Sequence, residues 1–367
     1  STGILYRYGQ KVSALLQDSI YAAAYGAIGI SIGILISSVV GFLHILFVFL
    51  VYRKSSGRKE QLKNQDRGQH IFRMLMGTAL PFMIYALLGR GILLLDGILF
   101  IRQKEGTADT VLLWGNYYGK CLPVLGIMIL FCILFHEGYI RRIIYFMDRE
   151  EFRMARERMA EFMQHIILIS FPVAVFTAVF SENLLNLFFK GNNAPLAQAV
   201  ATGSILIPLF AISYACAELL VRMRKMRYVL SLEGIAAITH GILMIVLLQS
   251  MGDSLFGILV AQIVPLAVFT VLSFILVLRG IQYRIDYMRR LAFPAATAAA
   301  AGLVCLAFNK LLSSFAGSTV SMIICIPVGI VIYIILLLIL KAISEDEIQK
   351  LPLAGMILFI GKLTRLL

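Results

Sequence analysis

Charged residues, nucleotide-binding motifs and paired cysteines are scarce or missing in this sequence of 367 residues. Only 14% of the residues are charged, whereas soluble domains contain about a quarter. There is no G-x-x-x-x-G-K-[ST] and no H-E-x-x-H, so the sequence predicts neither an enzyme nor a cofactor. The five cysteines form no C-x-x-C pair, which argues against a disulfide framework or a zinc site.

Long apolar runs are the dominant feature that is present. Hydrophobic residues make up 60% of the sequence, more than a soluble protein can bury. Runs of about twenty apolar residues recur, and each is long enough to cross a ~30 Å hydrocarbon layer as a helix. The alternating strands of an outer-membrane barrel are absent. We therefore expect an all-α polytopic membrane protein with about nine spanning helices, at 24–52, 74–101, 110–137, 163–187, 196–220, 229–249, 254–278, 291–311 and 319–341.

The positive charges gather in the short connections between these runs, and the formal net charge is +13. When the connection 53–73 is placed in the cytoplasm, 25 of the 33 Lys and Arg residues fall on that side and six on the other. This asymmetry follows the positive-inside rule. It predicts a multi-pass protein of the cytoplasmic membrane with a cytoplasmic C-terminus, in contact with membrane lipids, and it does not predict nucleic-acid binding.

Arg90 and Lys120 are placed near the middle of two successive expected spans, where an ionisable group costs several kcal/mol unless it is paired or hydrated. Counted from the outer helix ends, both lie about 16–18 Å deep. Asp96 and Asn116 form a second layer about 6 Å closer to the outside. Matched depths predict one hydrated cavity in which Arg90, Lys120, Asn116 and the adjacent Tyr117 bind an anion such as a phosphate.

A structural interpretation of the same residues stays open. Asp96 is able to pair with Lys120 across the hairpin and neutralise it, which would leave no charge for a ligand. His240 lies near the middle of the span 229–249, where a lone His is more often a hydrogen-bonded core residue than a proton relay. Glu233, near the start of that span, either meets the basic loop 222–227 or joins Asp96 and His240 as an ion-coupling candidate.

Four segments together carry a family resemblance. They are ALPFMIYALLGRGILLLDGILFIRQ, then LLWGNYYGKCLPVLGIMI, then ILISFPVAVFTAVFSENLLNLFFKG, and the tail SEDEIQKLPLAGMI. Their order resembles the multidrug/oligosaccharidyl-lipid/polysaccharide flippase superfamily. The tail is similar to the stage V sporulation protein B branch, which includes polysaccharide and lipid II flippase relatives.

The resemblance implies a MATE-like fold of fourteen helices, in which two six-helix lobes are followed by two C-terminal helices. The nine spans would then represent the last helix of a truncated first lobe, the second lobe and the final pair. This division predicts an N-terminal segment 1–23 that is the remnant of a loop, a last first-lobe helix 24–52, a basic cytoplasmic loop 53–73, a second lobe 74–278, a C-terminal pair 279–341 and an amphipathic cytoplasmic tail 342–367.

The resemblance also implies a function. Such proteins move an undecaprenyl-diphosphate-linked sugar, an oligosaccharide or a peptidoglycan precursor, between leaflets by alternating access. Arg90 and Lys120 would hold the diphosphate, and Asp96 matches an Asp that contributes to a sodium site in some relatives. His240 stands where those relatives supply Asn or Asp, so the sodium site does not carry over. A multidrug antiporter of the same superfamily and a non-transporting membrane scaffold remain alternatives.

Overall fold

The computed structural model describes residues 2–18, 20–55, 68–103, 107–134, 136–250, 255–282, 286–343, 348–349 and 354–364, and this part of the chain contains helices and no strand. Nine of its helices are long and apolar enough to cross a membrane. They coincide with the nine expected spans, which confirms the all-α membrane architecture. The chain divides into two units, residues 1–72 and 73–367.

The first unit contains α1 (Thr2–Leu16) and α2 (Ile20–Ser55), which pack on each other. Where we expected the remnant of a loop, the segment before the first span thus forms a helix. Gly9 allows the close approach, because a Cβ at this position would lie 2.7 Å from the Cβ of Tyr25. Ser31 stands in a G-x-S-x-G sequence, but it lies inside α2 and donates to Ala27 O, so it forms no strand-to-helix nucleophile elbow.

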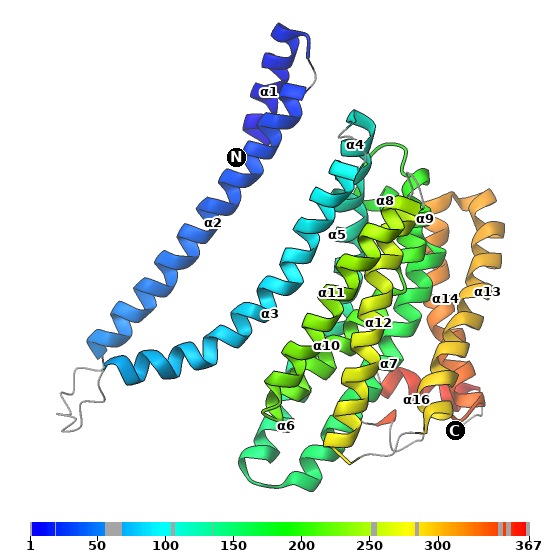
Figure 1. Cartoon of the computed structure of the whole chain (residues 1–367). Coiled ribbons are helices and arrows are strands. Elements are labelled where there is room, and N and C mark those ends of the chain that lie inside the picture. Colours follow the sequence, from blue (N-terminus) through cyan, green and yellow to red (C-terminus); the bar gives the residue numbers. More distant parts are fainter. Residues whose placement is uncertain are drawn as a thin grey trace. The chain divides into compact units, whose positions relative to one another are not determined.

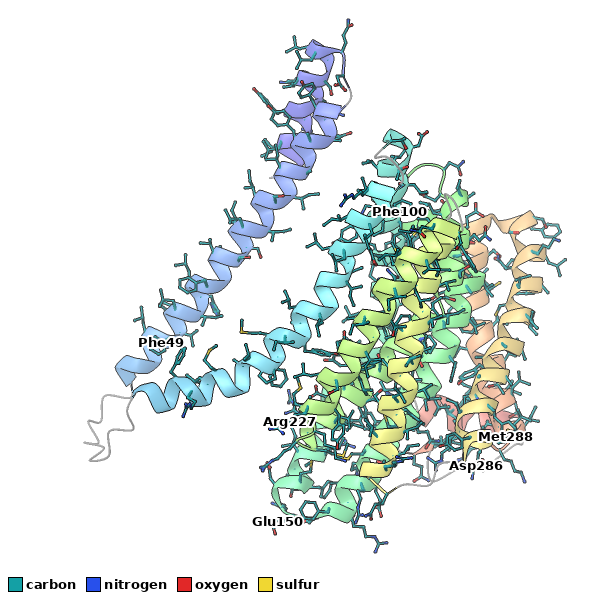
Figure 2. All side chains as sticks on the ribbon, in the orientation of Figure 1. Phe49, Phe100, Glu150, Arg227, Asp286 and Met288 are labelled. Atoms are coloured by element: carbon teal, nitrogen blue, oxygen red, sulfur yellow. The ribbon has the colours of Figure 1, made fainter. Side chains whose placement is uncertain are left out.

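The second unit is a bundle of helices, drawn from cyan to red in Figure 1. Its long helices are α3 (Gly68–Gln103, which begins just before the unit boundary), α7 (Phe152–Val179), α10 (Leu206–Arg222), α11 (Met226–Ser250), α12 (Leu255–Gly280), α13 (Phe293–Ala316) and α14 (Ser318–Ile339). Shorter segments are α4 (Ala108–Asn116), α5 (Leu122–Ile133), α6 (His136–Asp148), α8 (Ser181–Phe188), α9 (Ala194–Gly203) and α16 (Ala354–Leu363). Figure 2 shows Glu150 and Arg227 at one end of this bundle and Phe100 towards the other.

Two π-helical turns interrupt the helices at equivalent positions relative to proline. The turn η1 (Tyr117–Cys121) joins α4 to α5, and η2 (Met288–Ala292) precedes α13. Each ends two residues before a proline, Pro123 or Pro294, which has no N–H and whose ring clashes with the carbonyl four residues earlier. The residue before each proline donates five residues back instead, from Leu122 N–H to Tyr117 O in η1.

Two segments outside the spans, 138–162 and the tail, each pack one side against neighbouring helices. The segment 138–162 is divided between α6 and the start of α7, which pack on each other, and Met159 and Phe162 are buried. In the tail, α16 packs on α14 and Ile357 joins a buried cluster with Tyr333 of α14. In each case the apolar side of the segment packs on a neighbouring helix. Amphipathic spacing alone does not distinguish such packing from contact with lipid.

The C-terminal pair α13 and α14 docks on α7 through glycines. A Cβ at Gly302 of α13 would overlap Val175 of α7, and one at Gly329 of α14 would lie 2.9 Å from the ring of Phe176 and overlap Cys305 of α13. Small residues are needed at such contacts because helices in lipid associate mainly by close packing. Gly329 thus lies at the junction of all three helices.

We expect Gly329→Leu to destabilise the bundle by about 1–3 kcal/mol, because the added side chain overpacks this junction. The measurement is the thermal unfolding midpoint of the detergent-solubilised chain. Gly126→Leu in α5 is the matched control, since a Cβ there meets nothing within 4 Å. Equal destabilisation by both substitutions would contradict the packing role of Gly329.

Candidate functional site

The candidate site lies where α3 runs beside α11 in constant register. A Cβ at Gly89 of α3 would lie 3.7 Å from the Glu233 carboxylate of α11, and two turns further along Asp96 of α3 contacts His240 of α11. Both pairs have the same sequence separation, so the two helices run parallel with contacts repeating every seven residues. Figure 1 shows α3 and α11 as neighbours in this part of the bundle.

Asp96 and His240 form the centre of the site. Their side chains are 1% and 6% exposed, and the Asp96 Oδ1 to His240 Nε2 distance is 2.6 Å. On the other side of the ring, His240 Nδ1 lies 2.8 Å from the carbonyl oxygen of Ala261. A carbonyl oxygen only accepts, so Nδ1 carries a hydrogen and donates it. Nε2 and Oδ1 therefore share a further proton, carried by either atom, because two bare acceptors would repel at this distance.

Gln262 of α12 and Tyr117 of η1 extend the pair into a chain of hydrogen bonds. Gln262 Nε2 donates to Asp96 Oδ2 at 3.2 Å, and the Tyr117 hydroxyl donates to Gln262 Oε1 at 2.8 Å. Tyr117 is fully buried. The chain connects α3, η1, α11 and α12, and each polar group in it has a partner, as burial in an apolar bundle requires.

The indole of Trp114 covers this chain on the α4 side. A Cβ at Gly97 would lie 3.0 Å from the indole nitrogen, so the glycine after Asp96 allows Trp114 to pack on the α3 backbone. The Trp114 ring also lies 5.8 Å from the Phe100 ring and 5.7 Å from the Tyr117 ring, measured between centroids. Trp114 is the single tryptophan of the sequence.

Lys120 occupies a different environment in the same π-turn. Its side chain is half-buried, and its Nζ donates to Asn193 Oδ1 at 3.1 Å. Asn193 is buried in the connection between α8 and α9, where its amide donates to Asn186 Oδ1 and Phe189 O. The bond draws the ammonium towards this connection, although counting along the helix places the residue near the middle of its span.

Asp96 does not neutralise Lys120, contrary to the structural interpretation of the sequence. Asp96 is bonded to His240 and Gln262, and Lys120 to the neutral Asn193. Within the described part of the chain, no carboxylate lies within ion-pair distance of Lys120. Lys120 therefore keeps an uncompensated positive charge in this part of the structure.

The remaining predicted site residues are distributed around these groups. Asn116 is half-buried at the end of α4 and takes no part in the Asp96 chain. Glu233 lies beside Gly89 of α3, and its contact with the loop 222–227 stays a prediction. The side chain of Arg90 lies outside the described residues, and its predicted pairing with Lys120 in one cavity stays a prediction.

Gln262 is the member of the site that sequence reasoning missed. It interrupts the apolar run LFGILVAQIVPLAV, and an amide at membrane depth needs a hydrogen-bond partner, so its position was a usable signal. Asp96 and His240 are both ion-coupling candidates of the sequence, and the structure brings them into direct contact, which the sequence did not predict. His240 is a hydrogen-bonded core residue, as the more common behaviour of a lone His predicts.

Comparisons with protein-family models, with curated proteins and with solved structures found no match to this chain.

We expect Gln262→Leu to destabilise the bundle by about 1–3 kcal/mol, because it leaves Asp96 Oδ2 and the Tyr117 hydroxyl without their shared partner. Tyr117→Phe should then cost much less in the Gln262→Leu background than alone, since the bond is already lost. Unfolding midpoints of the two single variants and the double variant measure this coupling. Gln198→Leu, at an exposed position of α9, is the control that should change little, and strictly additive losses would contradict the hydrogen-bonded chain.

Proposed function

We propose that this chain is part of an alternating-access transporter that moves a diphosphate-linked sugar lipid between membrane leaflets. The observation that carries the proposal is the environment of Lys120. Its ammonium is half-buried in a membrane-spanning helix and bonded to a neutral amide. A cation kept without a neutralising carboxylate at such a position is costly, and an anionic ligand would offset that cost.

A diphosphate suits this site because it offers several charged acceptor oxygens to an ammonium that has donors to spare. Lys120 carries three N–H donors, and Asn193 uses one of them. Phosphate oxygens form short, charge-assisted hydrogen bonds that are roughly twice as strong as neutral ones. Arg90, one helix away, is expected to add a bidentate contact to the same group.

Prolines and π-turns interrupt the helices, which supports a transporter because its helices must bend. Pro81, Pro172, Pro265 and Pro327 lie in helix interiors, and Pro123 and Pro294 follow the π-turns. Such interruptions are tolerated in membrane bundles and are frequent in transporters. A π-turn often marks a functional position, and η1 carries both Lys120 and Tyr117.

The transported lipid would keep its hydrocarbon tail in the bilayer while the charged head passes through the protein. A cationic drug is a poorer substrate, because Lys120 repels it. This electrostatic preference distinguishes the proposal from a multidrug antiporter of the same superfamily, and the energy for transport would come from a gradient or from the membrane potential.

We expect Lys120→Met to lower the translocation of a fluorescent undecaprenyl-diphosphate disaccharide in proteoliposomes by about ten- to a hundredfold, through loss of a charge-assisted bond to the diphosphate. Lys120→Arg should retain most of the activity because the charge remains. The matched control is Lys190→Met, an exposed lysine in the connection that contains Asn193.

Each alternative has its own outcome in this assay. Undiminished translocation by Lys120→Met would remove the anion site from the mechanism. Uptake of ethidium by the wild-type chain, with no movement of the diphosphate lipid, would favour a drug antiporter. A folded wild-type chain that moves neither probe would favour a scaffold.

A further inference from the structure

The contact between Asp96 and His240 exists only with a fixed number of protons. The Nδ1 hydrogen of His240 is donated to Ala261 O, so only Nε2 faces Asp96. Nε2 is a donor when the ring is an imidazolium and an acceptor when the ring is neutral. In the first case Asp96 is a carboxylate, and in the second it carries the proton itself. Both arrangements contain one shared proton and give the pair no net charge.

Loss of that proton would leave two acceptors 2.6 Å apart and one uncompensated negative charge in the bundle. An unpaired buried charge is expensive in such surroundings, and rehydration or separation of the groups relieves it. Gln262 alone cannot compensate, because it already donates to the other carboxylate oxygen. The deprotonated pair is therefore expected to part, with α3 moving relative to α11.

We propose that Asp96 and His240 form a binding site for a single proton, and that this proton fastens α3 to α11 and α12. The inference goes beyond the proposed transport function, since it concerns a proton as ligand and a helix contact as the result. In the closed state the proton is shared, Gln262 holds Asp96, and Trp114 packs on Gly97. In the open state the proton is lost and these α3 contacts are released.

Among the residues that the structure describes, few other groups are in position to exchange this proton. Tyr117 is linked to the pair through the amide of Gln262 on α12, Lys120 and Cys121 share the turn η1 with Tyr117, and Glu233 lies on α11. Tyr117 already donates to Gln262, and Lys120 is engaged with Asn193. Glu233 lies two turns from His240, about 10 Å along the helix. The pair itself is thus the proton-binding unit.

Release of Asp96 would be transmitted to η1 through one amide. Gln262 uses its nitrogen for Asp96 and its oxygen for Tyr117, so a displacement of α3 acts on both ends of the same side chain. The π-turn that carries Tyr117 also carries Lys120. For Lys120 the consequence rests on the proposed function: the proton would then regulate the position of the cation that binds the diphosphate.

Trp114 provides a direct measurement of this contact. As the single tryptophan, lying on Gly97 and beside Phe100, it reports the separation of α3 without any ligand. We expect its emission in the full detergent-solubilised chain to shift to longer wavelength, and its quenching by acrylamide to rise, in a one-proton transition as pH increases. The sign follows because low pH keeps the proton and the closed contact.

Two variants of the pair give different outcomes. Asp96→Asn should remain closed at the higher pH values where the wild-type contact opens, because its amide donates to the neutral Nε2 while its oxygen accepts from Gln262, so that this contact needs no shared proton. His240→Leu should also lose the one-proton transition and show Trp114 more accessible, since Asp96 has lost its partner. Tyr118→Phe is the control: Tyr118 is an exposed neighbour that should leave the transition unchanged.

The proton site would be overturned if wild type showed no transition, or if Asp96→Asn retained the wild-type transition while eluting as a folded monodisperse species. Should His240→Leu fail to fold, the Asp96→Asn comparison decides by itself. In the translocation assay Asp96→Asn, which remains closed at the higher pH values, should lose turnover. A chain with the fluorescence transition but no lipid translocation would refute the proposed function and leave the proton site standing.

Discussion

A carboxylate and an imidazole that are almost completely buried among membrane-spanning helices can be accommodated only as partners. In this protein the Asp96–His240 contact satisfies both groups and determines how α3 lies against α11. The constant register from Gly89 and Glu233 to Asp96 and His240 follows from that constraint, because a shift by one residue would separate the pair. Gln262 and Tyr117 then complete the hydrogen bonds and bring α12 and η1 to the same point.

Backbone irregularities place the side chains that this contact needs. Pro123 displaces the hydrogen bonding of its helix by one residue, and the resulting π-turn carries both Tyr117 and Lys120. Close packing at the site also requires a glycine, since Gly97 allows the Trp114 indole to approach the α3 backbone. The same principle operates away from the site, where Gly302 and Gly329 allow α13 and α14 to dock on α7.

The turn η1 carries two side chains in different electrostatic environments, Tyr117 and Lys120. Tyr117 belongs to a neutral, fully bonded chain in which one proton decides the charge of the Asp96–His240 pair. Lys120 retains a positive charge and has a neutral partner in Asn193. At the opposite end of the bundle, Arg222 pairs with Glu218 at 2.6 Å, as the i,i+4 spacing predicts. Among the described residues no carboxylate neutralises Lys120, which supports the proposed ligand at η1, whereas the Arg222–Glu218 pair is compatible with a structural role.

Apolar length alone determined the fold class and the nine spans, because a run that crosses lipid must satisfy its own backbone and so must be a helix. The position of Asp96, Lys120 and His240 along their spans also identified them as candidate site residues from sequence, since burial of an ionisable group is costly wherever it occurs. Only the tertiary structure decided which of them meet: Asp96 bonds to His240 and not to Lys120, and Gln262 joins them. Residue spacing reports depth and the face of one helix, but the rotation of neighbouring helices about their axes depends on packing contacts that lie far apart in the chain.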